Sequence, residues 1–503
     1  MHGRHFRQGL ILVGLVLTIY LCVVPLISTA ADSSSNASTN TRKPIIFEED
    51  KNAKLFIHAD ERNDAEFFAR ISSKARKAAK GRNKGQGILK DSAKTSVHAL
   101  TKSIPHEEIF SETSKSRRFI PIFTGGREIY NPNVIPHPTK SDVWMVFGQH
   151  QQSGTQGVGA QQLVCAASLL EDVLSCTEDP AILSMEPSIE GQCDGKYATY
   201  NMRQGARDAR VFYGPDAPMI AYGSQSSYAC LGMWLQDLRS MVDVYTHESS
   251  SPVVFRTATE MLRPPPSKRF EKNFFLFWDE NNEPYVHHDM YPRRVFAALN
   301  EDGTIGPNMA VKVADKDNAC TAKYLPRLKS SEESVHQATN SLLITMCRRS
   351  DYDCRPHEGN TFIMTILHYK TYRDYHSVYE PYVMLFQNQL PFAIHAIGRK
   401  PLWIHGRRQA TEDMPSAKQA SSTNGASSDD SDSPNGATPT NQTEMFYMTS
   451  MSWKTHGQRY HGYIDDPIFL AFGIEDTKGA VMDVNAEHLV QNLGYCGGTP
   501  KYS

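Results

Sequence analysis

The 503-residue sequence lacks the short motifs that mark several large enzyme classes. It contains no Cys-x-x-Cys pair, no His-Glu-x-x-His, no Gly-x-Ser-x-Gly and no glycine-rich phosphate loop after a strand. These absences argue against a cysteine-based zinc site, a zinc protease, an α/β-hydrolase and a nucleotide-binding α/β fold. Long stretches with the 3.6-residue period of an amphipathic helix are missing as well.

A basic excess is also missing, because 53 Lys and Arg residues face 55 Asp and Glu residues, for a net charge of −2. Residues 119–503 alone carry 33 basic and 43 acidic side chains. An enzyme that acts on nucleic acid needs a basic face for the phosphates, so no nucleic-acid partner is expected. The 22 Phe and 22 Tyr residues can build a core, which argues against a disordered chain.

Charge is absent from Gln8 to Ala31, and most of this run is apolar. A helix of about 20 such residues spans the hydrocarbon core of a bilayer, and Arg4 and Arg7 ahead of it favour a cytosolic N-terminus. We therefore predict a single-pass type II signal anchor over residues 1–31, with the bulk of the chain in the lumen of the Golgi or endoplasmic reticulum. The alternative is a cleaved signal peptide that ends near Ala30. Both lead into the secretory pathway.

Cysteine usage fits this compartment. Apart from Cys22 in the apolar run, the chain has eight cysteines, an even number that is typical of disulfide-bonded secretory proteins. Cys347 and Cys354 bracket a short loop and are the pair that we expect to be bonded. Two glycosylation sequons, at Asn36 and Asn441, lie in polar segments where a glycan can be carried.

Composition divides the chain further. Residues 32–118 hold 18 basic and 12 acidic side chains and few aromatics, and are interpreted as a basic lumenal stem. Residues 119–490 form the globular part, and residues 491–503 a C-terminal tail. A stretch rich in Ser, Asp, Asn and Gly at 407–443 interrupts the globular part and predicts a long surface loop.

The globular part is expected to be all-β. Short apolar, β-branched or aromatic runs are separated by Gly, Pro, Asp and Asn, as in strands joined by turns. The predicted strands are 143–148, 162–169, 210–214, 219–224, 274–278, 341–347, 362–369, 382–387, 392–397, 446–453 and 468–473.

Polar clusters stand directly ahead of several strands, about 60–75 residues apart except for one longer gap that contains the low-complexity stretch. Units of this length are typical of propeller blades, whose inner strands begin beside a central channel. The repeat therefore predicts a five-bladed β-propeller in which the clusters meet at one channel end. The clusters are Asn131–Asn133, Arg207–Arg210, Glu271–Asn273, His336–Asn340 and His461–Asp466.

Some of these segments carry a resemblance to known families. Ala206–Phe212 resembles the Asp-x-Arg strand start of five-bladed propeller glycosidases and glycoside phosphorylases. Glu271–Asn273, followed by Phe274, is similar to the Glu-Lys-Asn-Trp element of mannoside phosphorylases. Tyr460–Asp466 and Gly473–Asp476 resemble the last blade of fungal sequences that include the Golgi β-mannosyltransferases, which are type II membrane proteins. The resemblance covers most of the globular part and implies a propeller fold with glycoside chemistry.

Sugar transfer passes through an oxocarbenium-like state and needs a carboxylate for proton transfer, while cations offset the charge of a leaving phosphate. The expected channel end supplies both kinds of residue. The candidate catalytic residues are Asp208, Asp465, Asp466 and Glu271. The candidate substrate-binding residues are Asn131, Arg207, Arg210, Lys272, Asn273, His288, Asn340, His461 and Tyr463.

A rival motif is the Asp-x-Asp at Asp351–Asp353, a pattern that binds a metal and a nucleotide diphosphate in many transferases. The same pattern occurs at Asp315–Asp317 and Asp430–Asp432, so it arises readily by chance. Its position between Cys347 and Cys354 favours a disulfide-closed loop tip instead. No cofactor is predicted, and a divalent cation is the open alternative.

Three functions fit these features. The first is a membrane-anchored, inverting glycosyltransferase of β-mannosyltransferase type, which joins a sugar donor to a glycan acceptor through a carboxylate general base. The second is a glycoside hydrolase or phosphorylase on the same scaffold. The third is a propeller that binds glycans or proteins without catalysis, which would lack carboxylates converging at the channel. The anchor and stem favour the transferase.

We predict that Asn441 carries a glycan, because residues 32–503 are expected to face the lumen. In cells that glycosylate secretory proteins, Asn441→Gln should increase the mobility of the chain on a denaturing gel, and endoglycosidase treatment should abolish the difference. Asn308→Gln, which alters no sequon, is the control. Digestion of the C-terminal part by protease added to intact vesicles would contradict this topology.

Overall fold

The computed structural model describes residues 105–151, 160–185, 191–202, 205–373, 376–410 and 442–498. The predicted anchor, most of the predicted stem and the asparagines of both sequons, Asn36 and Asn441, lie outside these ranges. In the part of the chain that is described, no helix is long and apolar enough to span a bilayer. Strands dominate this part, as predicted, and helices such as α4 (Ala314–Tyr324) and α5 (Ala486–Val490) are short.

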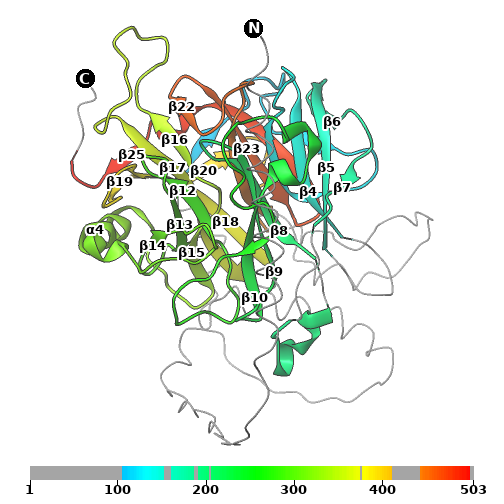
Figure 1. Cartoon of the computed structure of the whole chain (residues 1–503). Helices are drawn as coiled ribbons and strands as arrows, with labels where there is room; N and C mark the ends of the chain where they lie inside the picture. The colour runs from blue at the N-terminus through cyan, green and yellow to red at the C-terminus, as the bar shows by residue number, and fades with distance from the viewer. Residues whose placement is uncertain are drawn as a thin grey trace, which may run out of the picture. The chain divides into compact units, whose positions relative to one another are not determined.

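Most strands belong to antiparallel meanders that follow one another along the chain (Figure 1). The first contains β3 (Tyr130–Pro136), β4 (Trp144–Gln151), β5 (Ala160–Leu170), β6 (Val173–Cys176) and β7 (Ala181–Ile182). The second contains β8 (Arg207–Tyr213), β9 (Pro218–Gln225), β10 (Leu231–Asp237) and β11 (Thr259–Glu260). The third contains β12 (Phe275–Trp278), β13 (Pro284–Asp289) and β14 (Val295–Ala298).

Among the described meanders, the fourth spans the most residues. It contains β15 (Glu333–Gln337), β16 (Leu342–Thr345), β17 (Thr361–Arg373), β18 (His376–Gln387) and β19 (Ile394–Gly398). The last contains β21 (Phe446–Trp453), β23 (Pro467–Ile474) and β24 (Lys478–Asn485), while β22 (His461–Tyr463) pairs with β16. Every strand that the sequence predicted overlaps one of these strands.

Short segments at both ends of the folded part tie the meanders together. β1 (Glu107–Ile109) pairs with β20 (Leu402–Ile404), and β2 (Ile120–Phe123) joins β24 to β6. β25 (Leu493–Tyr495) pairs with β19. The described fold therefore extends beyond the predicted 119–490 boundaries on both sides, because strands of three residues are too short to give a periodic sequence signal.

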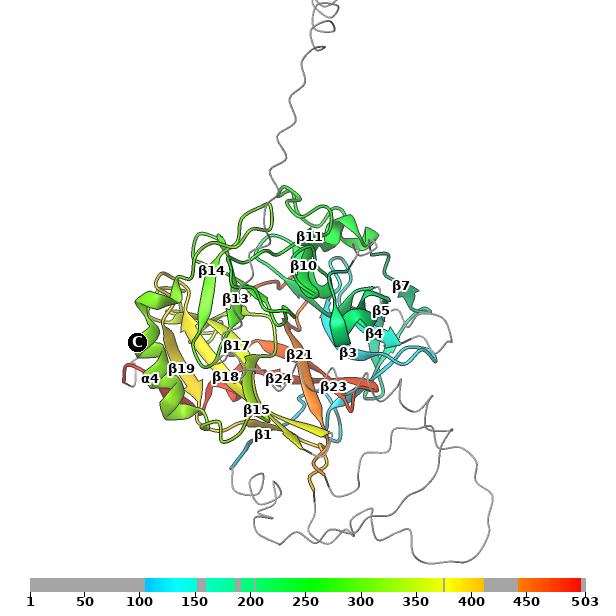
Figure 2. The same cartoon turned by 90° about the horizontal axis from the view of Figure 1, so that it is seen from below.

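The first strands of three meanders, β3, β8 and β21, lie next to one another in the middle of the molecule. β3 contacts β8 and β21, and β21 contacts β8 and β18. Figure 2 shows the sheets arranged around this central region. An arrangement of antiparallel sheets around a common centre is that of a β-propeller, so the predicted all-β propeller class is supported.

Asparagine side chains join these central strands. The amide of Asn133 on β3 donates to the Ala209 carbonyl (2.9 Å) and accepts from the Val211 N–H (3.1 Å), both on β8. Asn340, just ahead of β16, makes the same pair of bonds to the backbone of Met451 on β21 (3.0 and 2.9 Å). Asn133 and Asn340 are almost fully buried. The substrate-binding role of Asn340 stays a prediction, while its amide is used to hold two meanders together.

All eight cysteines from Cys165 onward are paired in disulfides. The predicted Cys347–Cys354 bond is present and closes a short loop after β16. The other pairs are Cys165–Cys176, Cys193–Cys230 and Cys320–Cys496. The last of these fastens α4 to the end of the described chain.

Replacing Asn340 by Ala should destabilise the fold markedly, because the N–H and C=O of Met451 would both lose a buried partner. Each buried backbone group left unpaired costs about 1–3 kcal/mol. Urea unfolding should show this loss, and Asn133→Ala should behave alike. The control is Asn300→Ala, whose exposed amide binds only Thr304 and which should change stability by less than about 0.5 kcal/mol. Equal stability of Asn340→Ala and Asn300→Ala would refute the bridging role.

Candidate active site

The starts of three central strands carry residues with unusual backbone geometry. Asn131 (φ 50°), Asp208 (φ 49°) and Asn273 (φ 59°) all adopt the left-handed conformation, which Asn and Asp tolerate better than other side chains. The ladder of β3 is irregular between Tyr130 and Asn133, and that of β8 between Arg207 and Arg210. Such bulges re-aim side chains and are common beside active sites.

Asp208 is held in place by its neighbours and remains accessible to solvent. Its carboxylate accepts a hydrogen bond from the Asn131 amide (2.9 Å), and its backbone N–H donates to Gln149 Oε1 (2.7 Å). The same Gln149 donates to the Tyr130 hydroxyl (2.6 Å). Burial, together with the negative charge of Asp208, raises the pKa of Tyr130 to about 12. Asn131 and Asp208, both predicted from the sequence, are thus brought together.

A second carboxylate, Asp476, shares this environment and was absent from the predicted site. It follows β23 and is accessible to water, yet surrounding protein raises its pKa to about 6 by desolvation, with the charges of Asp208 and Glu475 adding to the shift. Gly473 lies so close to Asn131 that a Cβ would meet Asn131 Oδ1 at 3.0 Å. The absence of a side chain there lets the end of β23 approach the start of β3.

Positive and aromatic side chains adjoin the two carboxylates. Burial lowers the pKa of Arg207, an effect that the charge of Asp208 opposes. The Arg210 guanidinium lies 5.6 Å from the ring centre of Tyr447 on β21, and the His336 ring stacks on Tyr447 at 6.1 Å. Lys370, which is buried on β17, interacts electrostatically with Asp476. Of the two predicted arginines, Arg207 therefore adjoins Asp208, whereas Arg210 packs on the neighbouring strand β21.

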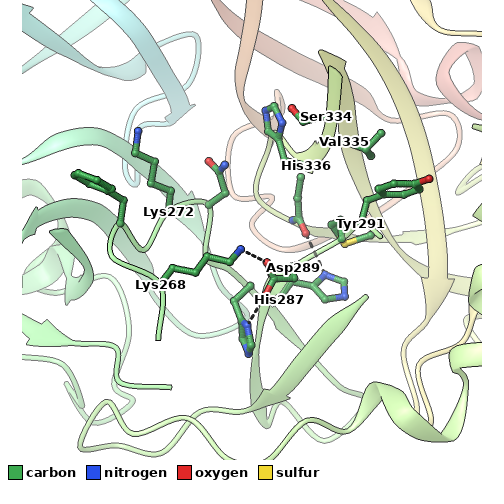
Figure 3. A pocket seen from close by; sticks show the side chains of 13 residues that line it. Lys268, Lys272, His287, Asp289, Tyr291, Ser334, Val335 and His336 are labelled. Atoms are coloured by element: carbon green, nitrogen blue, oxygen red, sulfur yellow. Dashed lines mark hydrogen bonds and ion pairs between the residues drawn. The ribbon is translucent and has the colours of Figure 1, made fainter. Parts of the chain in front are cut away.

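A pocket opens beside these residues, between the third and fourth meanders (Figure 3). The predicted residues Lys272, Asn273 and His288 line it, together with Asp289 and His336. Further lining residues are Lys268, Phe270, His287, Met290, Tyr291, Ser334, Val335 and Gln337.

Asp289 is the carboxylate that lines the pocket. Burial alone would raise its pKa, but hydrogen bonds from His288 and Lys268 outweigh burial and lower the pKa to about 2. Lys268 forms an ion pair with this carboxylate, and Arg263 lies 3.2 Å from its other oxygen. Figure 3 shows Asp289 with its oxygens turned toward Lys268. A negative carboxylate flanked by donors is suited to bind sugar hydroxyls.

His287, although it lines the pocket, has no nitrogen left for a substrate. Its Nε2 accepts from Arg294 Nε (2.7 Å), and its Nδ1 lies 3.0 Å from Gln337 Oε1. Because Arg has only donors, the proton of His287 is on Nδ1. Burial and the charge of Arg294 hold the pKa of His287 well below its usual value. His287 is thus a neutral part of the pocket wall.

Glu271, a predicted catalytic residue, is only 1% exposed and lies behind the pocket wall. Its carboxylate pairs with Arg263 (2.8 Å) and accepts from the Lys268 N–H (2.6 Å). Burial raises the pKa of Glu271, whereas Arg263 opposes the shift. The geometry makes Glu271 a support for the residues that hold Asp289, because its own oxygens do not reach the pocket lining.

The remaining predicted site residues lie at the other end of the fold. Asp465 accepts the Arg349 N–H (2.7 Å), Asp466 pairs with the Arg349 side chain (2.6 Å), and His461 is 2.8 Å from the Thr345 hydroxyl. Tyr463 stacks under the same Arg349 guanidinium at 4.3 Å. Their expected convergence with Asp208 is corrected by this placement.

The length of β17 gives the distance between the His461–Asp466 group and the surroundings of Asp476. Thr345 pairs with Thr361 at one end of β17, whereas Lys370, the neighbour of Asp476, lies nine residues further along. At about 3.3 Å per residue, the two ends are about 30 Å apart. The sequence predicts that the polar cluster at 461–466 precedes a central strand. The central strand of the last meander is β21. The strand β23 runs toward the candidate site, so its site residue, Asp476, follows the strand instead of preceding it.

The Asp-x-Asp motif belongs to this distant end as well. Asp351 and Asp353 are on the loop that the Cys347–Cys354 disulfide closes, and this loop is anchored by Asp465. The predicted disulfide-closed tip is therefore confirmed. Among the residues that the structure describes, no three His, Cys, Asp or Glu side chains are grouped to hold a metal ion.

No known protein family and no curated protein matches the sequence. Similar solved structures include a β-1,2-mannobiose phosphorylase from Listeria innocua (11% identity, 73% of this chain and 91% of that chain, TM-score 0.39). Others are a GDP-Man-dependent mannosyltransferase from Leishmania mexicana (10%, 77% and 92%, 0.36) and a thermostable family-43 glycoside hydrolase (10%, 76% and 98%, 0.32). All three TM-scores are below 0.5, so the fold assignment rests on the strand order and contacts described above.

Asp476→Asn should stabilise the protein at neutral pH. A carboxyl whose pKa is higher in the folded chain than in the unfolded chain costs stability once it ionises, so stability is lost as the pH rises from 3.8 to about 6. The melting temperature of Asp476→Asn should therefore exceed that of the parent at pH 7.5, and the difference should vanish near pH 4.

Asp302→Asn provides a control of opposite sign. Hydrogen bonds from Thr304 lower the pKa of Asp302, so the parent gains stability from this carboxylate above its ordinary pKa and loses it as the pH falls. The variant should melt below the parent at pH 7.5. The same sign for both variants would show that the environment of Asp476 is not the one described.

Proposed function

We propose that the protein is an enzyme that breaks or forms glycosidic bonds, with Asp208 and Asp476 as its acid/base pair. The observation that carries the proposal is the meeting of two water-accessible carboxylates, one of which has a pKa of about 6. Glycoside chemistry uses two carboxyl groups whose environments separate their roles. A non-catalytic propeller has no need for two like charges close enough to interact, which costs stability.

The roles follow from the surroundings of each carboxyl group. Asp476, which holds its proton at a higher pH than an ordinary carboxyl, is suited to donate that proton to the leaving oxygen. In bond formation, Asp208 is suited to take the proton of an acceptor hydroxyl, with Asn131 and Gln149 fixing its position. We propose a single displacement with inversion at the anomeric carbon, and mannose as the first sugar to test.

The basic residues beside the pair favour an anionic reaction partner. Arg207 adjoins Asp208 and Lys370 interacts with Asp476, while Arg210 packs on Tyr447 of β21 and Lys272 lines the adjoining pocket. An enzyme that uses only water has little use for such a group of cations, whereas a phosphate requires it. We therefore favour a glycoside phosphorylase, in which phosphate attacks the anomeric carbon while Asp476 protonates the departing sugar oxygen.

A glycosyltransferase, the function that the sequence favoured, is the second candidate. The same cations can offset the charge of a leaving nucleotide diphosphate, and the apolar N-terminal run suits an enzyme fed with nucleotide sugar in the lumen. In this version the protein is a β-mannosyltransferase-like enzyme of Golgi or endoplasmic reticulum membranes, anchored through residues 1–31.

We further infer that the meanders are the blades of a five-bladed propeller and that the folded part is lumenal. The succession of antiparallel meanders along the chain, together with the mutual contacts of β3, β8 and β21, supports the former. The pairing of all eight cysteines after the apolar run supports the latter, since disulfides persist in oxidising compartments.

One experiment separates the candidates. The purified full chain is incubated with β-mannosides with or without inorganic phosphate, and with nucleotide sugars plus mannoside acceptors. Sugar 1-phosphate formed only with phosphate supports the phosphorylase, and release of nucleoside diphosphate with a lengthened acceptor supports the transferase. Free sugar regardless of phosphate indicates a hydrolase. No conversion of any substrate would refute the proposed enzyme.

Asp208→Asn and Asp476→Asn should each lower turnover by about 10²–10⁴-fold, the usual contribution of a general acid or base. Asp465→Asn is the matched control, because Asp465 binds the backbone of the distant loop, and should leave turnover within a few-fold of the parent. Initial rates under saturating substrate measure both. Loss of activity in Asp465→Asn with full activity in Asp476→Asn would overturn the assignment.

A further inference from the structure

A short segment outside the meanders forms a small core of its own beside the candidate active site. It contains the 3-10 helix η3 (Gly195–Met202), which projects from the strands near the start of β8 (Figure 1). The buried side chains of this core are Cys193, Tyr197, Tyr200, Cys230, Leu231 and Phe270. The cluster is separate from the larger apolar clusters of the sheets.

The segment is fastened at its start. The Cys193–Cys230 disulfide links it to the residue ahead of β10. Asn201 closes the segment on itself, since its side chain accepts the Cys193 N–H (3.0 Å) and donates to the Cys193 carbonyl (2.7 Å). Gln225 on β9 adds a bond to the Tyr200 carbonyl (3.3 Å). A segment this short holds its form because of these bonds, as it has few apolar contacts elsewhere.

The same segment packs against Arg269 and Phe270, which lead into the pocket. The rings of Tyr197 and Tyr200 pack on Phe270 at 5.0 and 5.5 Å between centres, and Phe270 lines the pocket. The Arg269 guanidinium covers Tyr197 at 4.6 Å and donates to the Asp194 carbonyl (3.1 Å).

Backbone hydrogen bonds from the residues next to the Cys193–Cys230 disulfide also hold residues 269–271. The Cys230 N–H donates to the Arg269 carbonyl (2.9 Å), and the Glu271 N–H donates to the Leu231 carbonyl (2.9 Å). Lys272 and Asn273 follow directly and line the pocket. Their positions are thus set by what holds residues 269–271.

The segment also reaches the surroundings of Asp208, because Tyr200 interacts electrostatically with Arg207, the neighbour of Asp208. We propose that Cys193–Met202 is the specificity flap of the site. Through Phe270 it fixes Lys272 and Asn273, and with them the length of sugar chain that the pocket accepts. This inference rests on the proposed function for its substrate, whereas the grip on residues 269–271 is independent of it. The residues of the flap are positioning residues.

The test compares two disulfides of the full-length chain. Cys193→Ser/Cys230→Ser removes the staple of the flap, and Cys165→Ser/Cys176→Ser removes a disulfide between β5 and β6 in the first meander as the matched control. Amide hydrogen exchange of the peptide covering 268–273 should become about tenfold faster or more in the first variant, and should stay unchanged in the control. Unchanged exchange at 268–273 in the first variant overturns the proposal.

Kinetics test the specificity with the substrate that the parent converts best. The ratio of kcat/KM between a disaccharide and a longer oligosaccharide of the same linkage should shift by about tenfold in the flap variant, since small misplacements of pocket residues have large effects. The control should keep the parental ratio, and an equal shift in both variants would refute the specificity role. If the parent converts no sugar, the proposed function fails, while the exchange experiment still decides whether the flap holds the pocket.

Phe270→Leu covers the case in which the disulfide variant does not fold. It keeps an apolar side chain but loses the contacts to Tyr197 and Tyr200, so it should reproduce the faster exchange and the altered ratio. Phe255→Leu, in the main core, is the matched control and should alter neither. Parental exchange and a parental ratio in folded Phe270→Leu would also overturn the proposal.

Discussion

The central strands of this protein present their unpaired edges to one another. An exposed edge carries backbone N–H and C=O groups that need partners when buried. Here side chains supply them: Asn133 binds the edge of β8, and Asn340 binds that of β21. Thr449 and Ser452 of β21 donate in turn to backbone carbonyls of β3. The polar residues at the centre therefore hold the sheets together before any ligand is considered.

The candidate active site lies at the starts of these central strands. Left-handed residues at the starts of β3, β8 and near β12 turn Asn131, Asp208 and Asn273 out of the ladder, so they are available for a ligand. One residue further along each of these strands, the side chain is buried in the interior. This division explains why two polar residues of one cluster, such as Asn131 and Asn133, serve different purposes: the first holds Asp208, and the second bridges two sheets.

Sequence patterns predicted the strands well because each is an apolar run flanked by turn residues, and they located the first three clusters because an inner edge needs polar side chains there. They failed in the last meander. β22 is a three-residue strand whose polar flanks look like a strand start, whereas Asp476 stands in a turn between β23 and β24, where an acidic residue is ordinary. In the sequence, only the resemblance of Gly473–Asp476 to the last blade of fungal sequences points to this residue, since its desolvation is a tertiary property. The catalytic role of Glu271 stays a prediction, and its burial is a tertiary property that the sequence does not reveal.

The base of the low-complexity stretch shows how an insertion can be accommodated. Arg407 Nε donates to the Glu444 carbonyl (2.9 Å), and the Glu444 N–H returns a bond to the Arg408 carbonyl (3.0 Å), so the two ends of the stretch are locked side by side. Ala410 and Thr443 add a third bond at the rim. With the ends fixed in this way, doubling the length of what lies between them costs only about 0.6 kcal/mol in closure entropy. Evolution, or a protein engineer inserting a reporter domain, can therefore change that length with little effect on the strands that carry the site.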